Sequence, residues 1–218
     1  MKDAADYLVS SLFEPPCAGC RQRLPHPLDG AVCEGCWQRL RQSRHLQQRH
    51  PRSAIDWWCA VDHYEDRLKE IIHALKYERR RSISPRLGAL MRECGASMLA
   101  DADAVVPVPL HPRRHYERGF NQAADLAQHL GPPLLPMLKR VKYTRSQIEL
   151  PKQERSENVR DAFAFVGRQP SGSLRVVVLV DDVSTTGATL DACARVLKAA
   201  GVAEVRALTA ARVVSEPR

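Results

Sequence analysis

The chain has 218 residues, of which 44% are hydrophobic, 27% are charged and 6% are aromatic. This composition is that of a globular protein and excludes disordered and fibrous chains. Charged residues and histidines interrupt every apolar stretch before it reaches the roughly 18 residues of a membrane-spanning helix, so we expect no membrane insertion. The N-terminus lacks the apolar core and the cleavage site of a secretory signal, and we therefore expect a cytoplasmic protein.

Basic residues exceed acidic ones, with 33 Lys and Arg against 25 Asp and Glu and a formal net charge of +8. An excess of this sign attracts anionic partners such as phosphorylated ligands, nucleic acid or acidic membranes. Basic residues are dense between Lys139 and Arg155, where Glu149 and Glu154 are the only acids. Because few apolar residues accompany them, this stretch is interpreted as a mobile basic loop.

Four cysteines near the N-terminus form two CxxC pairs, Cys17 with Cys20 and Cys33 with Cys36. Two such pairs turn four thiolates toward one point, which is typical of a zinc ribbon. A redox dithiol or a disulfide pair is the alternative interpretation. Four thiolate ligands leave no open coordination position, so the expected zinc is structural. The other three cysteines, Cys59, Cys94 and Cys193, lie among apolar residues and are expected to be small core residues.

The first 53 residues are interpreted as one unit and residues 54–218 as a second. Apolar residues from Ala5 to Phe13 follow helical spacing until Pro15 ends the pattern, and the ribbon comes next. The polar run from Arg41 to Ser53 suits a linker or a frayed helix. A ribbon this small depends on its metal for stability, and we expect the larger unit to survive its loss.

The second unit alternates apolar strands with amphipathic helices. Strands are expected near residues 55–61, 104–108, 134–138, 162–166, 174–180 and 205–211, and helices near 68–77, 87–98, 120–130 and 187–200. Continuous apolar strands separated by helices indicate an α/β fold with a parallel sheet covered on both faces. Ligands of such sheets bind at the carboxyl ends of the strands.

A candidate phosphate site follows the most apolar of these strands. Asp181 and Asp182 come first, and after Val183 the loop supplies Ser184, Thr185, Thr186, Gly187, Ala188 and Thr189 at the start of a helix. Hydroxyls and the free N–H groups of a helix N-terminus form a cradle for an anion. The two carboxylates suit sugar hydroxyls or Mg²⁺. A simple capped helix start is the alternative, but it accounts for one hydroxyl rather than four.

The string VVVLVDDVSTTGATL resembles the phosphoribosyl diphosphate (PRPP) binding motif of type I phosphoribosyltransferases. Other segments resemble the ComF family, which comprises competence-associated, phosphoribosyltransferase-like proteins with an N-terminal zinc ribbon. These segments are Leu75-Lys76-Tyr77, the stretch VPVPLHPRRHYERGFNQA over residues 106–123, and Arg145, Gln147, Arg155, Asn158 and Phe163. The resemblance covers nearly the whole chain.

The resemblance implies a type I phosphoribosyltransferase-like parallel sheet flanked by helices, with a small zinc-ribbon module. It also implies that PRPP binds with Mg²⁺, that Asp181 and Asp182 hold the ribose as the catalytic pair, and that residues 184–189 hold the 5-phosphate. Arg113, Arg114 and Arg118 are implied diphosphate ligands, with a solvated loop face as the alternative. The basic loop, with Arg145, Gln147, Arg155 and Asn158, corresponds to the family's hood over the substrate.

The expected activity is transfer of phosphoribosyl from PRPP to an acceptor, with release of diphosphate. His73, His111 and His115 are general-base candidates by residue type alone, and the acceptor leaves no recognisable signature. The alternative function is non-catalytic handling of single-stranded DNA within the transformation machinery. A third option is an assembly adaptor that docks to a DNA-uptake helicase through the ribbon. Trp37, Trp57 and Trp58 are the candidates for base stacking, although at least one of the adjacent pair is expected in the core.

Overall fold

The computed structural model describes residues 16–24, 26, 28, 30–43, 45–49, 53–142, 161–166 and 174–213. The elements in chain order are α2 (Glu34–Arg41), β1 (Leu46–Arg49), β2 (Trp57–His63), α3 (Asp66–Tyr77), the 3-10 turn η2 (Arg81–Ile83), α4 (Ser84–Cys94), α5 (Ala96–Leu99), β3 (Ala104–Pro107), α6 (Pro112–Arg118), α7 (Gln122–Ala127), β4 (Leu138–Arg140), β5 (Phe163–Phe165), β6 (Val176–Ser184), α9 (Ala188–Ala199) and β7 (Glu204–Arg212). The expected helix at residues 5–13 and the four hood residues lie outside the described residues. In the described part of the chain, no helix is long and apolar enough to cross a membrane.

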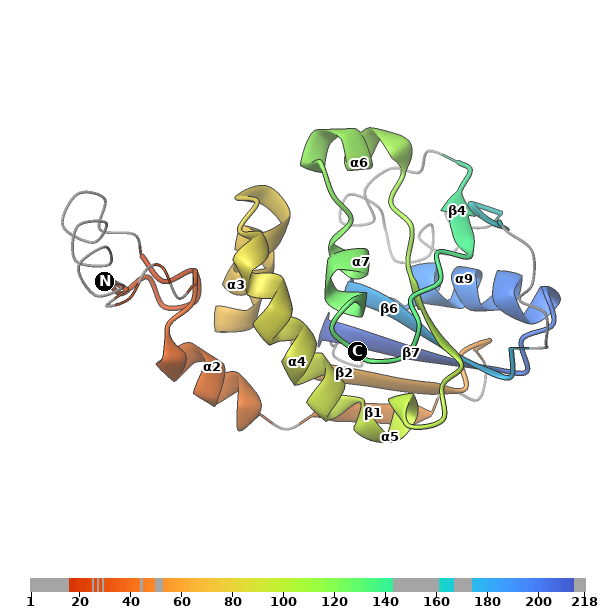
Figure 1. The fold of residues 1–218 in the computed structure, drawn as a ribbon, viewed down its shortest axis with the longest axis horizontal. Coiled ribbons are helices and arrows are strands. Elements are labelled where there is room, and N and C mark those ends of the chain that lie inside the picture. The colour runs from red at the N-terminus through yellow and green to blue at the C-terminus, as the bar shows by residue number, and fades with distance from the viewer. Residues whose placement is uncertain are drawn as a thin grey trace, which may run out of the picture.

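A five-stranded sheet in the order β1-β2-β7-β6-β3 forms the centre of the molecule (Figure 1). Strands β2, β7, β6 and β3 run parallel, and β1 pairs antiparallel with β2. The predicted parallel α/β sheet is therefore confirmed. Because the four parallel strands end at the same edge, the segments that follow them converge there.

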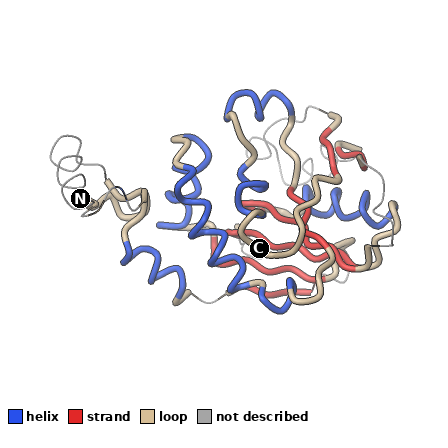
Figure 2. Tube along the Cα trace, in the orientation of Figure 1, coloured by secondary structure: helices blue, strands red, loops and turns tan. Residues whose placement is uncertain are grey.

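Helices cover both faces of this sheet, as the sequence predicts (Figure 2). Val178 and Val180 of β6 pack in a core cluster with α3, α4 and α7. Their neighbours Val177 and Leu179 point to the opposite face and pack with α9. Successive strand residues face opposite sides, so a strand buried on both faces is continuously apolar.

Strand β1 is a correction to the sequence analysis, which treats the run from Arg41 to Ser53 as a linker or a frayed helix. Residues Leu46 to Arg49 pair with Ala60 to Trp57 in antiparallel register. The strand lies at the sheet edge, and its side chains are exposed after the half-buried Leu46. Because backbone pairing holds it rather than buried side chains, the sequence carries no alternation that would reveal it.

Two further elements differ from the expectations. The strand expected at residues 134–138 is displaced, because Leu134 makes only a single bridge to Val105 and β4 begins at Leu138. Strand β4 pairs with β5 in a separate two-stranded sheet. Helix α6, which the sequence analysis leaves in a loop, has no buried residue and therefore no apolar stripe to reveal it.

The cysteines outside the CxxC pairs are buried, as predicted. Cys59, Cys94 and Cys193 are at most 4% exposed. Cys59 on β2 and Cys94 at the end of α4 also form a disulfide, which the sequence analysis does not anticipate. The packing of α4 across β2 brings these distant residues together, and no local sequence pattern encodes that contact.

Candidate functional site

The four CxxC thiols form one cluster, with all sulfur atoms within 4.8 Å of one another. The Sγ atoms of Cys17 and Cys36 are 3.8 Å apart, and those of Cys20 and Cys33 are 3.7 Å apart. A tetrahedral zinc with Zn–S bonds of about 2.3 Å requires sulfur–sulfur separations of about 3.8 Å. The cluster therefore fits a structural zinc ion held by four thiolates.

Backbone N–H groups stabilise the thiolate form of Cys17. The N–H groups of Cys33 and Gly19 donate to its Sγ, at 3.2 and 3.4 Å. Burial raises the pKa of Cys17, but these backbone hydrogen bonds outweigh it and lower the pKa to about 7. Thiolates are the metal-binding form of cysteine, so these donors favour metal loading.

The cysteine module, meaning the described residues from 16 to 41, packs on α3 and α4. Cys36, Trp37 and Leu40 belong to the same core cluster as the α3 residue Ile71. A Cβ built on Gly19 would lie 3.0 Å from Cys36 Sγ and 3.3 Å from Ile71 Cδ1, so this glycine permits close approach. Surface ion pairs such as Arg21 to Glu70, at 2.7 Å, join the same two parts.

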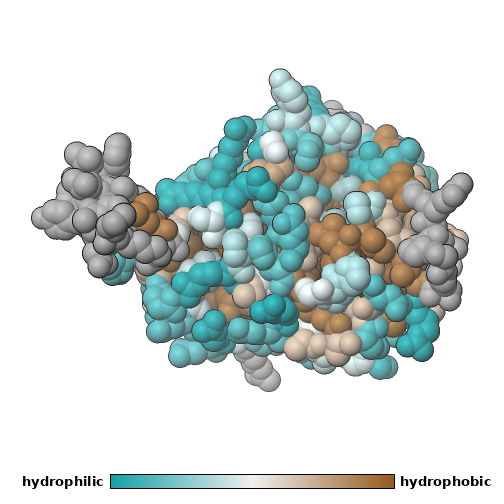
Figure 3. Space-filling view, in the orientation of Figure 1, coloured by the Kyte–Doolittle hydropathy of each residue, from teal (hydrophilic) through white to brown (hydrophobic). Residues whose placement is uncertain are grey.

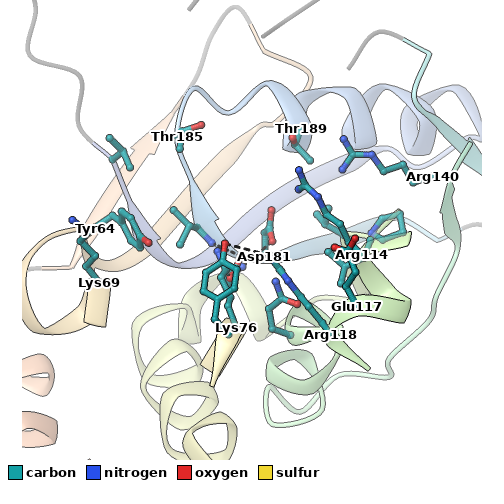
Figure 4. A pocket seen from close by; sticks show the side chains of 18 of the residues that line it. Tyr64, Lys69, Lys76, Arg114, Glu117, Arg118, Arg140, Asp181, Thr185 and Thr189 are labelled. Carbon is teal, nitrogen blue, oxygen red and sulfur yellow. Dashed lines mark hydrogen bonds and ion pairs between the residues drawn. The ribbon is translucent and has the colours of Figure 1, made fainter. Parts of the chain in front are cut away.

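A cleft of about 760 Å³ opens at the carboxyl ends of the parallel strands. Its walls come from β6, from α3 and from the segments after β2, β3 and β7. Figure 4 shows most of the side chains that line it. The lining residues are Tyr64, Lys69, Lys76, Tyr77, Arg79, Val108, Pro109, Leu110, Arg114, Glu117, Arg118, Gln122, Arg140, Asp181, Asp182, Val183, Thr185, Thr189 and Val213.

The two aspartates are the last part of β6 rather than a loop that follows it. Asp181 and Asp182 both line the cleft, as the sequence analysis expects. Lys76 from the last turn of α3 places its Nζ 2.6 Å from Asp182 Oδ2, and the two side chains are 15% and 5% exposed. A buried lysine thus supplies a cation beside the acidic pair. Sequence analysis assigns Lys76 no role, since it lies in a remote segment.

Burial shifts the pKa values of both Asp181 and Lys76 in the cleft. Burial raises the pKa of Asp181 to about 6, although Lys76, Arg140 and Arg118 act in the opposite direction. Burial also lowers the pKa of Lys76 to about 8, against the attraction of Asp181, and two nearby arginines lower it further. Perturbed acid and base groups in a cleft are a mark of a functional site.

The loop from Ser184 to Thr189 has the conformation of an anion cradle. Gly187 precedes α9 with φ of +78°, a left-handed conformation that side chains disfavour. Thr185 and Thr189 line the cleft, and the Thr186 hydroxyl accepts from the N–H of Ala188 at 3.4 Å. The Ser184 Oγ is buried and has no hydrogen-bond partner among the described residues. This loop therefore presents hydroxyls and a helix N-terminus to the cleft.

The structure separates the three expected diphosphate arginines. Arg114 and Arg118 line the cleft, whereas Arg113 does not and forms an ion pair with Glu117 at 3.0 Å. Arg140 of β4 joins the first two from a distant part of the chain. Burial lowers the pKa of Arg118 and of Arg140, and repulsion from Arg114 adds to both shifts. Clustered, half-buried cations of this kind favour an anionic ligand.

The general-base candidates lie away from the cleft lining. His73 contacts Tyr77 with ring centroids 4.8 Å apart, and the His111 ring accepts from the N–H of Arg113 at 3.2 Å. His115 is exposed on α6. Gln122, which the sequence analysis does not single out, does line the cleft, and its buried Oε1 has no partner among the described residues.

Two of the three tryptophans proposed for base stacking are core residues. Trp37 and Trp58 are each 4% exposed, whereas Trp57 is 37% exposed. The expectation that one of the adjacent pair is buried is confirmed. The Arg49 guanidinium lies over the Trp57 ring, 4.0 Å from its centroid. Trp37 and Trp58 are therefore not available for stacking on a nucleic acid.

Comparison with known proteins agrees with this geometry. Residues 116–217 match the phosphoribosyl transferase domain family. The chain is 30% identical to Competence protein F of Haemophilus influenzae, an alignment that covers 94% of this chain and 100% of that protein. The chain belongs to the ComF family. Its fold is that of a phosphoribosyltransferase-like protein, to which the cysteine module is added.

Two more relatives and one solved structure are similar to parts of this chain. Competence protein ComFC of Bacillus subtilis is 31% identical, over 87% of this chain and 80% of that protein. The DNA utilization protein YhgH of Escherichia coli K12 is also 31% identical, over 88% and 75%. A solved allosteric regulatory enzyme of purine biosynthesis aligns with 58% of this ComF chain and 26% of its own, with 23% identity and a TM-score of 0.36.

Proposed function

We propose that this ComF protein binds PRPP with Mg²⁺ in the cleft and transfers the phosphoribosyl group to an acceptor, with release of diphosphate. The observation that carries the proposal is the ion pair between Lys76 and Asp182 beside Asp181. Two adjacent carboxylates would repel a polyanion, but a buried cation at 2.6 Å offsets one of the charges. The remaining carboxylate oxygens then suit ribose hydroxyls and a hard cation.

The rest of the cleft supports a division of PRPP among three groups of residues. The loop from Ser184 to Thr189 suits the 5-phosphate because hydroxyls and a helix N-terminus face the cleft. Arg114, Arg118 and Arg140 suit the diphosphate, since guanidinium groups match phosphate oxygens. In Figure 4, Thr185 and Thr189 lie above Asp181, and Arg114, Arg118 and Arg140 lie to its right.

The proposed reaction is a displacement at C1 of the ribose. The bond from C1 to the diphosphate oxygen breaks, and both electrons leave with diphosphate. A lone pair of the acceptor forms the new bond to C1, and any proton on the attacking atom passes to water. Bound Mg²⁺ would supply charge neutralisation for the leaving group. Asp181 and Asp182 orient the ribose and face the positive charge that develops on it, while the arginines stabilise the departing anion.

Calorimetric titration of the protein with PRPP and Mg²⁺ tests the binding step. We expect Asp182→Asn and Arg118→Gln to weaken binding, and Glu93→Gln, a half-exposed residue away from the cleft, to leave it unchanged. A screen for diphosphate release over nucleobases, amines and oligonucleotides tests the transfer step. Equal affinities for PRPP in the wild type and all three variants would contradict the proposal.

A second candidate function is the handling of single-stranded DNA with a DNA-uptake helicase. The observation in its favour is that relatives carry the names Competence protein F and DNA utilization protein. The formal charge of +8 suits such a partner. Binding of a single-stranded oligonucleotide that falls steeply with salt, and that Asp182→Asn leaves unchanged, would favour this function over transfer.

A further inference from the structure

The cleft has a second end that the proposed sites for ribose, phosphate and diphosphate do not use. We call it the tyrosine end and define it as Tyr64, Lys69, Tyr77, Arg79 and Val213, all of which line the cleft. Figure 4 shows Tyr64 and Lys69 on the side of Asp181 opposite to Arg114, Arg118 and Arg140. A ligand held beside Tyr64 and Lys69 would therefore approach the ribose from the side away from the proposed diphosphate site, while Tyr77 and Arg79 lie between the two.

Neighbouring elements of the fold hold this end together. Tyr64 follows β2, and its backbone N–H donates to the carbonyl of Arg212 at 2.8 Å, which places Val213 beside it. Tyr77, at the end of α3, is 58% exposed. Its ring is fixed by contact with His73 and by the Arg118 guanidinium, which lies 5.2 Å from the ring centroid. The walls are thus formed before any ligand arrives.

The charge at this end is positive. Among the described residues, no carboxylate lies within ion-pair distance of Lys69. Burial raises the pKa of Tyr64, with further contributions from Tyr77 and Glu70, and Glu70 is itself paired with Arg21 at 2.7 Å. Arg79 donates to the backbone carbonyl of Glu117 at 3.0 Å rather than to a carboxylate. Lys69 is therefore an exposed cation that lines the cleft and has no carboxylate partner among the described residues.

The spacing of two lysines on α3 sets the size of the ligand. Lys69 and Lys76 are seven residues apart, so they lie on one side of the helix, about 10 Å apart along its axis. Lys76 marks the ribose position through Asp182. A six-membered ring that is bonded to C1 of the ribose and carries an acidic group on its far side would reach from the ribose position to Lys69. Phenol rings and the Val213 side chain suit the faces of such a ring.

We propose that the tyrosine end is the acceptor subsite and that the acceptor is a planar aromatic carboxylic acid, with Lys69 as the carboxylate partner. This inference rests on the proposed transfer function. A neutral nucleobase or an aliphatic amine would leave Lys69 without a counter-charge. An aromatic acid matches both features, because its ring can pack against the phenol walls while its carboxylate pairs with the ammonium group of the exposed Lys69.

Ligand-observed NMR on the full chain, without PRPP, tests the subsite with two matched pairs, benzoate with benzamide and nicotinate with nicotinamide. We expect each acid to bind at least tenfold more tightly than its amide. Lys69→Gln should abolish this difference, and Tyr64→Leu should weaken both members of a pair. Arg92→Gln removes an exposed charge from α4, away from the cleft, and should change nothing.

Equal binding of acids and amides to the wild type, no binding of any probe, or an acid preference that survives Lys69→Gln would each overturn the inference. Uridine monophosphate serves as a further probe, and Lys69-dependent binding of it in place of the acids would overturn the carboxylic-acid class. A separate thermal-shift titration with PRPP and Mg²⁺ distinguishes the two proposals. A normal PRPP shift in Lys69→Gln, together with lost acid preference, supports the subsite; absence of a PRPP shift in the wild type contradicts the transfer function instead.

Discussion

Lys76 of α3 and Asp182 of β6 form a buried ion pair, with Nζ 2.6 Å from Oδ2. The contact links the helix that supports the cysteine module to the strand that carries the acidic pair. Figure 3 shows that the outer face over α3 and α4 is mostly hydrophilic. The charge of Lys76 is therefore directed into the cleft while the exposed side of its helix faces water.

Removal of this lysine should cost stability. Lys76→Met leaves Asp182 as a buried charge without its partner, and we expect the free energy of unfolding to fall by about 3 kcal/mol. Lys198→Met is the matched control, because Lys198 pairs with Asp56 at 2.9 Å but both side chains are about one-third exposed. That change should cost about 1 kcal/mol or less. Urea unfolding measures both, and the double variant with Asp182→Asn should recover part of the loss.

Binding of PRPP should depend on pH with two limbs. Ionised Asp181 is needed for the ribose and a cation, so affinity should rise as pH passes its pKa of about 6. Affinity should fall above pH 8, where Lys76, whose pKa is lowered to about 8, loses its charge. Calorimetry between pH 5 and 9 measures the profile. Asp181→Asn should remove the part of the affinity increase near pH 6 that comes from ionisation of Asp181. The increase that remains comes from ionisation of PRPP itself.

The stability of the fold should fall as Asp181 ionises, whereas PRPP affinity should rise. Burial raises the pKa of Asp181 from 3.8 to about 6, so the folded chain binds more protons than the unfolded chain between these values. The free energy of unfolding that Asp181 contributes is therefore fully present below pH 4 and is lost as pH rises through about 6. Between pH 4 and 7, the free energy of unfolding of the wild type should fall relative to that of Asp181→Asn, as unfolding curves at each pH would measure. A parallel pair of curves would contradict the shifted pKa.

Loss of zinc should destabilise the whole described fold rather than the cysteine module alone. The module shares a core cluster with α3 and α4, which leads us to a different expectation from the sequence analysis. Cys33→Ser should lower the melting temperature of a single transition by more than about 5 °C. Cys193→Ala, a buried cysteine outside the cluster, is the control. Two separate transitions, with the upper one unchanged, would mean that the module folds independently.

Gly187 should be required for its backbone conformation. Its φ of +78° would cost an alanine about 1–2 kcal/mol, although a Cβ there would meet no atom within 4 Å. Gly187→Ala should therefore lower stability and weaken PRPP binding together. Gly35→Ala is the matched control, since Gly35 also has open space but lies in α2 without a positive φ, and the change should be neutral or stabilising. Similar effects of both changes would contradict the strain argument.

The sequence alone determined those features that depend on near neighbours. The apolar run of β6, the stripe of α3 and the two CxxC pairs each encode their structure within about 20 residues, because strand and helix periods and metal spacing are local properties. Asp181, Asp182 and the loop that follows are contiguous for the same reason. These elements could be predicted, and so could the parallel sheet to which β6 belongs.

Only the tertiary structure decided which distant residues meet. The sheet order brings the ends of β2, β7, β6 and β3 to one edge. The packing of α3 then places Lys76 against Asp182, and β4 of the second sheet brings Arg140 into the same cleft as Arg118. The tertiary structure also turned Arg113 away from the cleft, although its neighbour Arg114 lines it, because successive residues of a helix point in different directions. Such contacts depend on how helices pack on the sheet, and no local pattern in the sequence records that packing.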